Sequence, residues 1–230
     1  MAIAVNDAVT EILRPFPDAA VAGSGSYASI ALEYLNKADR YLAFHLPIRW
    51  DSEDINLTAG TSEYAFAAET VARVWSVRYL RSANQDDNYR LKETDITRLD
   101  LEFGNWRGLE NDEPQMFYIG ATSAGALRLG VTPAPNLTTS GGYPILRCNV
   151  TRFGTLAAGG DLPANIRSSD VYVFTACWRY AQDFRRIDEA EYYKNLMMRA
   201  IDEERDFFFG RNAYDKQSII YGAFPSGGIV

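Results

Sequence analysis

Apolar residues recur at helical spacing near the start of the chain, which predicts two helices there. The first covers residues 4–14 and ends before Pro15 and Pro17. Its apolar positions are Val5, Ala8, Val9 and Ile12. The second helix ends before Pro47, and its apolar stripe consists of Ile30, Tyr34, Leu35, Ala38, Tyr41 and Leu42. We expect its polar side to consist of Glu33, Lys37, Asp39 and Arg40.

The helical spacing returns over residues 169–209 and predicts a pair of helices joined at residues 185–187. Asp188 is followed three residues later by Glu191, a variant of the capping box. We therefore expect the last helix to begin at Asp188. Its outer face is expected to carry Glu189, Lys194, Arg199, Glu203 and Glu204.

Between these helical regions the apolar pattern has a period of two, which is typical of β-strands. The predicted strands cover residues 55–57, 64–66, 74–79, 89–91, 116–119, 126–131 and 143–153. A short helix is expected at residues 94–103, with Ile96, Leu99 and Phe103 on one face and Asp95 paired with Arg98. Residues 154–168, with three glycines and Pro163, are predicted to form a loop.

This order of elements indicates an α+β fold rather than alternating βαβ units. We expect a helical bundle made of N-terminal helices at about 4–46 and a C-terminal helix pair at about 169–209. An antiparallel β-rich region at about 54–155 is inserted between them. At 230 residues, the chain is predicted to form a single domain over residues 1–210, followed by an extended C-terminal tail.

The tail, residues 211–230, sustains neither a helical nor a strand period. It combines a net charge of +1 with bulky apolar residues and Pro225. Such a segment either packs along its own domain or becomes ordered on the surface of a partner. The candidate partner-binding residues are Tyr214, Ile219, Ile220, Tyr221, Phe224, Pro225, Ile229 and Val230.

The chain carries 23 Lys and Arg against 30 Asp and Glu, a net charge of −7. This balance argues against electrostatic gripping of nucleic acid, although it is compatible with a protein that lets DNA pass. The acids concentrate in residues 84–113, where nine stand against four bases. No secretory signal and no membrane-spanning run is expected. Cys148 and Cys177 are expected to be buried reduced thiols, with a disulfide as the alternative.

The sequence shows none of the common catalytic motifs. His45 is the only histidine, so a Ser-His-Asp or Cys-His arrangement has little to build on, and the sequence contains no metal-ligand motif and no dinucleotide fingerprint. Pairs of carboxylates that could hydrolyse a glycosidic bond remain open, because thirty acids allow many pairings. We expect a protein that is not an enzyme and needs no metal or cofactor.

Several segments together resemble head-to-tail adaptor proteins of tailed bacteriophages. The run at residues 34–42 (YLNKADRYL) is followed by Leu46-Pro47-Ile48 and by residues 55–64 (INLTAGTSEY), a segment that forms a hairpin in the family. The family order continues with a strand like Val77-Arg78-Tyr79 and an acidic short helix followed by a tryptophan, here Trp106. The strands at Phe117-Tyr118 and 127–129 and the helical pair at 171–209 complete the resemblance, which spans most of residues 26–209.

The resemblance implies a structural virion protein. Such adaptors form a ring, typically of twelve copies, that docks under the portal protein, extends the DNA channel and carries the next tail or nozzle protein. The expected partners are therefore the chain itself, the portal, the tail-side protein and double-stranded DNA that passes without specific binding. The expected location is the neck of the virion, after synthesis in the host cytoplasm.

Two alternatives stay open beside the adaptor: another connector-ring protein, such as a stopper or tail terminator, and a tail-associated peptidoglycan hydrolase. For the adaptor, an acidic channel wall would keep DNA from adhering, because like charges repel. The acids that we expect to line the channel are Asp86, Asp87, Glu93, Asp95, Glu203 and Glu204.

Overall fold

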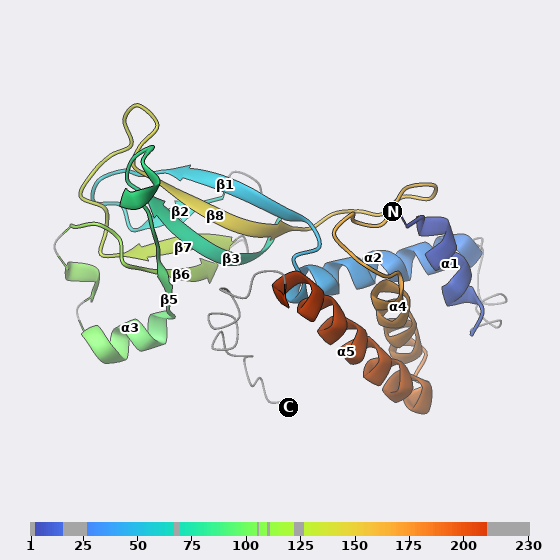
Figure 1. Cartoon of the computed structure of the whole chain (residues 1–230). Helices are drawn as coiled ribbons and strands as arrows, with labels where there is room; N and C mark the ends of the chain where they lie inside the picture. Colours follow the sequence, from blue (N-terminus) through green and yellow to red (C-terminus); the bar gives the residue numbers. More distant parts are fainter. Residues whose placement is uncertain are drawn as a thin grey trace. The chain divides into compact units, whose positions relative to one another are not determined.

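The computed structural model describes residues 3–15, 27–66, 70–104, 106–109, 111–121 and 127–210 (Figure 1). The chain divides into two compact units. The first contains the described residues of segments 1–49 and 153–230, and the second contains those of segment 50–152. Among the described residues, every strand lies in the second unit and all α-helices but one lie in the first. The predicted α+β fold class is therefore confirmed.

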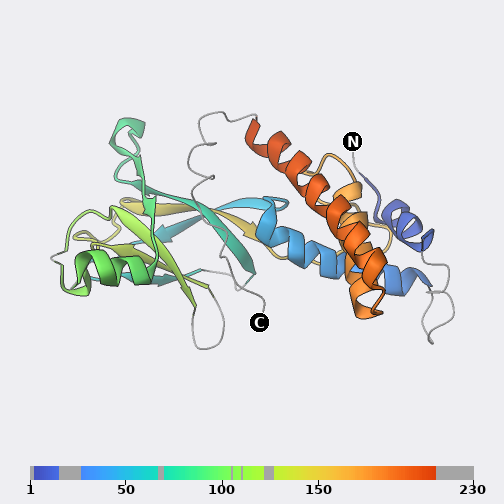
Figure 2. The same ribbon diagram turned by 90° about the horizontal axis from the view of Figure 1, so that it is seen from below.

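Helices α1 (Val5–Leu13), α2 (Tyr27–His45), α4 (Asp170–Asp183) and α5 (Ile187–Gly210) form the first unit. α1 packs on α2 and α4, and α4 pairs with α5 in a helical hairpin that Figure 2 shows from below. The buried residues of α1 are the four that the sequence predicted: Val5, Ala8, Val9 and Ile12. In α2 the predicted stripe is also largely buried, but Asp39 lies on the buried side, with no exposed area. Its assignment to the polar side was wrong.

The turn between α4 and α5 places a non-glycine residue in a left-handed conformation. Arg185 has a φ of 55°, and its N–H donates to the carbonyl of Gln182 over 3.1 Å. The N–H of Arg186 donates to the carbonyl of Ala181 over 2.9 Å, which completes the hydrogen-bond pattern of a Schellman motif, where glycine is usual at the left-handed position. α5 begins at Ile187, so Asp188 lies in its first turn and the predicted capping role was wrong.

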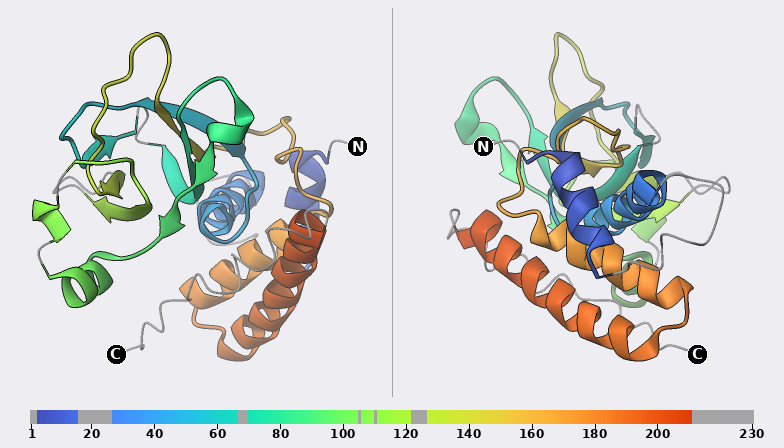
Figure 3. Two further views of the ribbon diagram at one scale, coloured as in Figure 1. Left: turned by 60° about the vertical axis from the view of Figure 1, so that its left-hand side comes forward. Right: turned by 90° about the vertical axis from the view of Figure 1, so that its right-hand side faces the viewer.

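The second unit contains two four-stranded sheets, of which Figure 3 gives two further views. The first sheet has the order β1 (Trp50–Asn56), β8 (Ile145–Arg152), β3 (Val71–Leu80) and β4 (Tyr89–Arg90). The second has the order β2 (Glu63–Ala65), β7 (Leu127–Thr132), β6 (Met116–Ala121) and β5 (Lys92–Glu93). All neighbouring strands are antiparallel except β5 and β6.

One cluster of buried apolar side chains joins the two sheets. Val77 and Leu146 enter it from the first sheet, and Phe117 and Leu129 enter it from the second. The strands of this unit extend from Trp50 to Arg152, so the β-rich region begins and ends slightly earlier than the sequence predicted. Cys148 lies in this core and Cys177 lies in α4; both are buried free thiols, as expected, and burial raises the pKa of each to about 12.

The short acidic helix is α3 (Ile96–Phe103), followed by the 3₁₀ turn η3 (Trp106–Gly108). Leu99 is its only buried residue, so the predicted apolar face shared with Ile96 and Phe103 is not buried. Asp95 caps the helix by accepting a hydrogen bond from the backbone N–H of Arg98 over 2.8 Å, while the Arg98 side chain pairs with Glu102. The predicted Asp95–Arg98 side-chain pair was therefore wrong.

An aromatic ring covers a glycine in the second sheet. Gly130 on β7 is the cross-strand neighbour of Tyr118 on β6, and a methyl group on Gly130 would lie 2.0 Å from Cζ of the Tyr118 ring. That ring packs edge-on against Trp106, with 5.4 Å between the ring centroids. Glycine at position 130 therefore allows β6, β7 and the η3 turn to share one small core.

Candidate functional site

The C-terminal residues proposed for partner binding lie outside the described residues. They are Tyr214, Ile219, Ile220, Tyr221, Phe224, Pro225, Ile229 and Val230.

Four of the six acids proposed to line a channel lie on the surface of the second unit. Asp86 and Asp87 form part of the 3₁₀ turn η2 (Gln85–Asp87), and Asp87 accepts a hydrogen bond from the hydroxyl of Ser82 over 2.9 Å. Glu93 is exposed on β5. Asp95 is exposed, but its carboxylate caps α3. These four acids lie within 10 residues of one another along the chain. Two of them have local structural roles: Asp87 bonds to Ser82, and Asp95 caps α3.

The other two acids, Glu203 and Glu204, lie on α5 in the first unit. Glu203 is exposed and pairs with Arg199 over 3.3 Å. Glu204 is only 4% exposed, and its carboxylate accepts hydrogen bonds from the backbone N–H groups of Arg167 and Ser168 at 3.0–3.2 Å. Glu204 therefore holds the loop that leads into α4, and its expected place on the outer face of the last helix was wrong.

Burial raises the pKa of Glu204 above its usual value, and the two backbone N–H groups offset this only in part. Because the folded-state pKa lies above the unfolded one, its contribution to stability is full at pH values below the usual pKa and is lost as the pH rises through the folded pKa. We expect Glu204→Gln, which keeps Oε1 as the acceptor, to be at least as stable as the wild type at pH 7. Relative to the wild type it should lose this advantage near pH 4.

Glu204→Ala removes the acceptor and should cost about 1–3 kcal/mol of unfolding free energy, because two partly buried N–H groups lose their partner. Urea unfolding of the wild type and both variants at the two pH values measures these effects. Glu203→Gln is the matched control, since the Glu203 side chain is 67% exposed and its replacement should leave stability nearly unchanged. If Glu204→Gln proves as destabilising as Glu204→Ala, the role assigned to Oε1 is contradicted.

The buried carboxylate of Asp39, on α2, pairs with Arg49 and also bonds to α4 in the first unit. The guanidinium of Arg49 donates from one nitrogen to both carboxylate oxygens of Asp39, at 2.5 and 2.6 Å. The hydroxyl of Tyr172, on α4, donates to the same carboxylate over 2.9 Å. The pKa of Tyr172 is raised well above its usual value, first by burial and then by the negative charge of Asp39. Asp39 therefore keeps two buried donors satisfied at once.

Gly154 lies directly against this ion pair. A methyl group on Gly154 would lie 2.4 Å from Cζ and 2.5 Å from Nε of Arg49. Arg49 immediately precedes β1, and Gly154 comes two residues after the end of β8. The Asp39–Arg49 pair and the glycine beside it therefore hold together the two segments of the first unit that lead to these strands.

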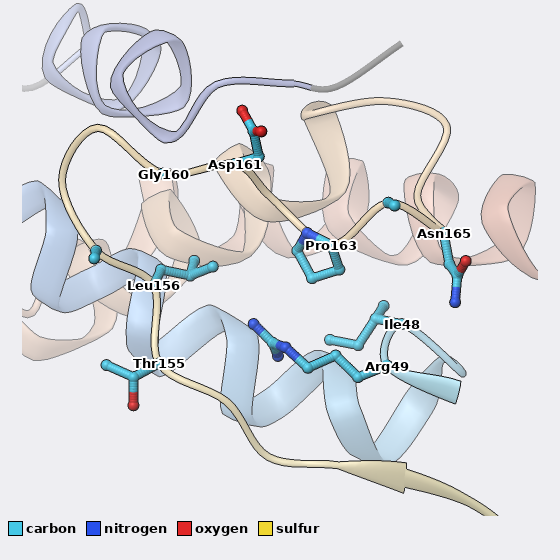
Figure 4. Close-up of a pocket in the computed structure, with 10 residues that line it drawn as sticks. Ile48, Arg49, Thr155, Leu156, Gly160, Asp161, Pro163 and Asn165 are labelled. Carbon is cyan, nitrogen blue, oxygen red and sulfur yellow. The ribbon is translucent and has the colours of Figure 1, made fainter. Parts of the chain in front are cut away.

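A hollow of about 490 Å³ opens beside Arg49 (Figure 4). Its wall combines apolar side chains, such as Ile48, Leu156 and Pro163, with the polar side chains of Thr155, Asp161 and Asn165. In Figure 4 the Asp161 carboxylate points away from Arg49. Because Asp39 compensates the charge of Arg49, the guanidinium offers hydrogen-bond donors to the hollow without an unpaired positive charge. The residues that line the hollow do not include a pair of groups placed for acid–base or nucleophilic chemistry.

A second polar cluster connects the surfaces of α2 and α4. Asp183 accepts hydrogen bonds from the Tyr34 hydroxyl over 2.9 Å and from the Lys37 ammonium over 3.0 Å. The Lys37 hydrogen bond is the main cause of a lowered Asp183 pKa, and burial is the main cause that raises the pKa of Tyr34 to about 12. These hydrogen bonds stabilise the packing of α2 against α4 at its solvent-exposed edge.

The burial of Asp39 could have been predicted from the sequence, although the predicted apolar stripe of residues 30–42 left it out. Leu35, Asp39, Leu42 and Leu46 follow one another at intervals of four, three and four residues, which places them on one helical face. An aspartate within such a stripe is buried and requires a partner, and Arg49 follows ten residues later. Periodicity alone could have placed Asp39 in the core, but not its contact with Tyr172, 133 residues away.

Within the described residues there is no group of three or more His, Cys, Asp or Glu side chains placed to hold a metal ion. None of the described helices is long and apolar enough to cross a membrane. A comparison of the chain with models of known protein families and with curated protein sequences found no match.

Proposed function

We propose that this chain is a structural virion protein, a head-to-tail adaptor of a tailed bacteriophage. In this proposal several copies form a ring in the neck, dock under the portal, extend the DNA channel and carry the tail-side protein. The helices form the bundle of the ring, and the β-rich region is an insertion in that bundle. The chain acts through assembly and performs no bond-making of its own.

The observation that carries the proposal is the order of elements along residues 27–210. A helix containing the YLNKADRYL run is followed by β1 and β2 on either side of the LTAGT turn, and then by the long strand β3. The short acidic helix α3 with Trp106, the paired strands β6 and β7, and the hairpin of α4 and α5 follow. This order agrees with the resemblance to adaptors except at the LTAGT turn, where a hairpin was expected but β1 and β2 lie in different sheets.

The charge of the chain is compatible with a DNA conduit. Acids outnumber bases by seven, and Asp86, Asp87 and Glu93 are exposed on the second unit. A wall with the same sign of charge as the DNA backbone repels it and lets it slide. In this proposal Asp86, Asp87, Glu93 and Glu203 contribute to the channel, and Asp95 and Glu204 stabilise the fold.

Deleting residues 211–230 is expected to leave both units folded and to abolish binding to portal rings. The reason is that the tail supplies the apolar anchors Phe224-Pro225 and Ile229-Val230. The measurement is co-sedimentation of the purified chain with portal rings or with packaged heads, followed by electron microscopy of the complex.

The control for this deletion is a full-length chain in which Asp215 is replaced by asparagine, which leaves the apolar anchors in place. If the truncated chain still binds portal rings, the tail is not needed for portal binding, and the alternative that it packs along its own domain is favoured. A full-length chain that binds neither portal nor packaged heads would reject the adaptor proposal.

A further inference from the structure

Three arginines that are far apart in the sequence lie side by side on the first sheet of the second unit. Arg147 on β8 is the cross-strand partner of Arg78 on β3, and Arg78 is the partner of Arg90 on β4. All three are exposed. The residues on either side of each arginine belong to, or pack against, the buried cluster that joins the two sheets, so the three side chains share the outer face. We call them the arginine row.

One carboxylate stands at the end of the arginine row. Asp54 on β1 is the cross-strand partner of Arg147 and accepts two hydrogen bonds from its guanidinium, at 2.7 and 2.8 Å. The side chain of Arg78 makes no hydrogen bond or ion pair within the described part of the chain. Like charges that face each other across strands destabilise a sheet. Three guanidinium groups beside one carboxylate therefore cost stability in the isolated chain, and an anion bound to them would offset that cost.

The geometry of the row favours an anion that carries several charges in a line. Neighbouring strands lie about 4.8 Å apart, so the row extends over about 10 Å. Guanidinium groups bind phosphate oxygens through pairs of N–H donors. The adjacent row on the same face consists of Ser52, Asn149 and Ser76, which hydrogen-bond to one another. Neither row contains an apolar side chain, whereas the centre of a protein interface is largely apolar, so a chain of phosphates fits this surface better than a protein does.

We propose that the arginine row contacts the phosphate backbone of double-stranded DNA. Phosphate contacts carry no sequence information, so the contact is independent of the DNA sequence. The choice of duplex DNA as the source of the phosphates rests on the proposed function, in which the duplex passes through the neck. The net charge of −7 does not reveal this surface, because positions 78, 90 and 147 become neighbours only when the strands pair.

The contact is weak and sensitive to salt because few charges take part. Two to three phosphate contacts predict that the logarithm of the binding constant falls against the logarithm of the salt concentration with a slope of about −2 to −3. The exposed acids Asp86 and Asp87 lie in η2, the turn beyond the ends of β3 and β4, and are not members of the row. The second unit thus presents DNA with acids that repel it and with one row that holds it loosely.

The test is the fluorescence anisotropy of a labelled duplex of about 20 base pairs, titrated with the full chain between about 20 and 200 mM salt. Arg78→Gln should bind at least about threefold more weakly at the lowest salt, with a slope shallower by about 1. Its thermal stability should not fall, because the change removes one of three like charges, and a merely structural role would predict a loss. Asp54→Asn should bind the duplex more tightly, since it releases Arg147 from its partner.

Arg199→Gln is the matched control, because it removes one positive charge from α5, where this side chain is 79% exposed. It should bind DNA like the wild type. The inference is overturned if the wild type does not bind the duplex at the lowest salt, if Arg78→Gln and Arg199→Gln weaken binding equally, or if Asp54→Asn weakens it. Polyglutamate with the same number of charges should bind less tightly than the duplex, and tighter binding would reassign the row to an acidic polypeptide and overturn the inference.

Portal binding is measured separately, so the two proposals can fail independently. A chain that binds portal rings but no DNA would remove this contact and leave the adaptor proposal standing. A chain that binds the duplex through Arg78 but neither portal rings nor packaged heads would reject the adaptor proposal and leave the phosphate contact standing.

Discussion

Replacing Asp39 by alanine is expected to cost about 3 kcal/mol of unfolding free energy. The change removes the acceptor of the buried Tyr172 hydroxyl and leaves the Arg49 guanidinium without its counter-charge. Breaking a buried ion pair costs roughly 3–5 kcal/mol, and the lower figure applies because the Arg49 side chain is 24% exposed. Urea unfolding gives the size of the loss, and hydrogen exchange of α2 and α4 peptides shows whether it falls on the first unit.

Two further variants separate the charge from the packing at this position. Asp39→Asn keeps an oxygen that can accept from Tyr172 and should lose less than the alanine variant. The triple variant Asp39→Leu, Arg49→Met, Tyr172→Phe removes both charges together with the hydroxyl that would lose its acceptor, and it should recover most of the stability, since apolar side chains avoid the desolvation cost. Equal losses in the single alanine variant and the triple variant would show that lost packing, rather than an unpaired charge or hydroxyl, is responsible.

Replacing Gly130 by alanine is expected to cost about 2–3 kcal/mol, because the added methyl group would lie 2.0–2.3 Å from three atoms of the Tyr118 ring. The ring cannot withdraw freely, since it is only 3% exposed and packs against Trp106. The second sheet and the η3 turn should both loosen. Thermal unfolding followed by near-ultraviolet circular dichroism, which reports on the packing of these rings, measures the loss.

Gly120→Ala is the matched control, because Gly120 lies on the adjacent strand β6 and a methyl group there would meet nothing within 4 Å. It should change stability by less than about 0.5 kcal/mol. The penalty at Gly130 should also shrink when Tyr118 is replaced by alanine, since the clash then has no second partner. A penalty that is unchanged in the Tyr118→Ala background would place its origin in the strand backbone instead.

Most helices and strands could be predicted from the sequence because each depends on a local period of apolar residues. The α1 positions Val5, Ala8, Val9 and Ile12 are an example, since one face of a short helix decides their burial. β1 begins at Trp50, five residues before its predicted start, because its outer half carries Asp51, Ser52 and Asp54 and shows no apolar alternation. Pairing with β8 keeps this half in the sheet, with Asp51 bonded to Arg152 and Asp54 to Arg147.

The errors concern polar residues whose partners are distant in the sequence. The sequence neighbours of Glu204 are charged, as on the exposed face of a helix, yet its carboxylate is buried and accepts hydrogen bonds from backbone N–H groups 36 and 37 positions earlier. Asp95 was paired with the nearest arginine side chain, but the backbone N–H of that arginine is the better donor at a helix start. Periodicity predicts burial, and a single sequence does not predict which buried polar groups meet across the fold.

The pairing of Trp50 with Thr151 determines how easily the second unit can be replaced. Because these residues are cross-strand partners, the polypeptide enters and leaves the second unit through two adjacent strands. The entropic cost of bringing such ends together rises only slowly with the length of the segment between them. A unit with adjacent ends can therefore be lengthened or replaced without rethreading the helices on either side of it.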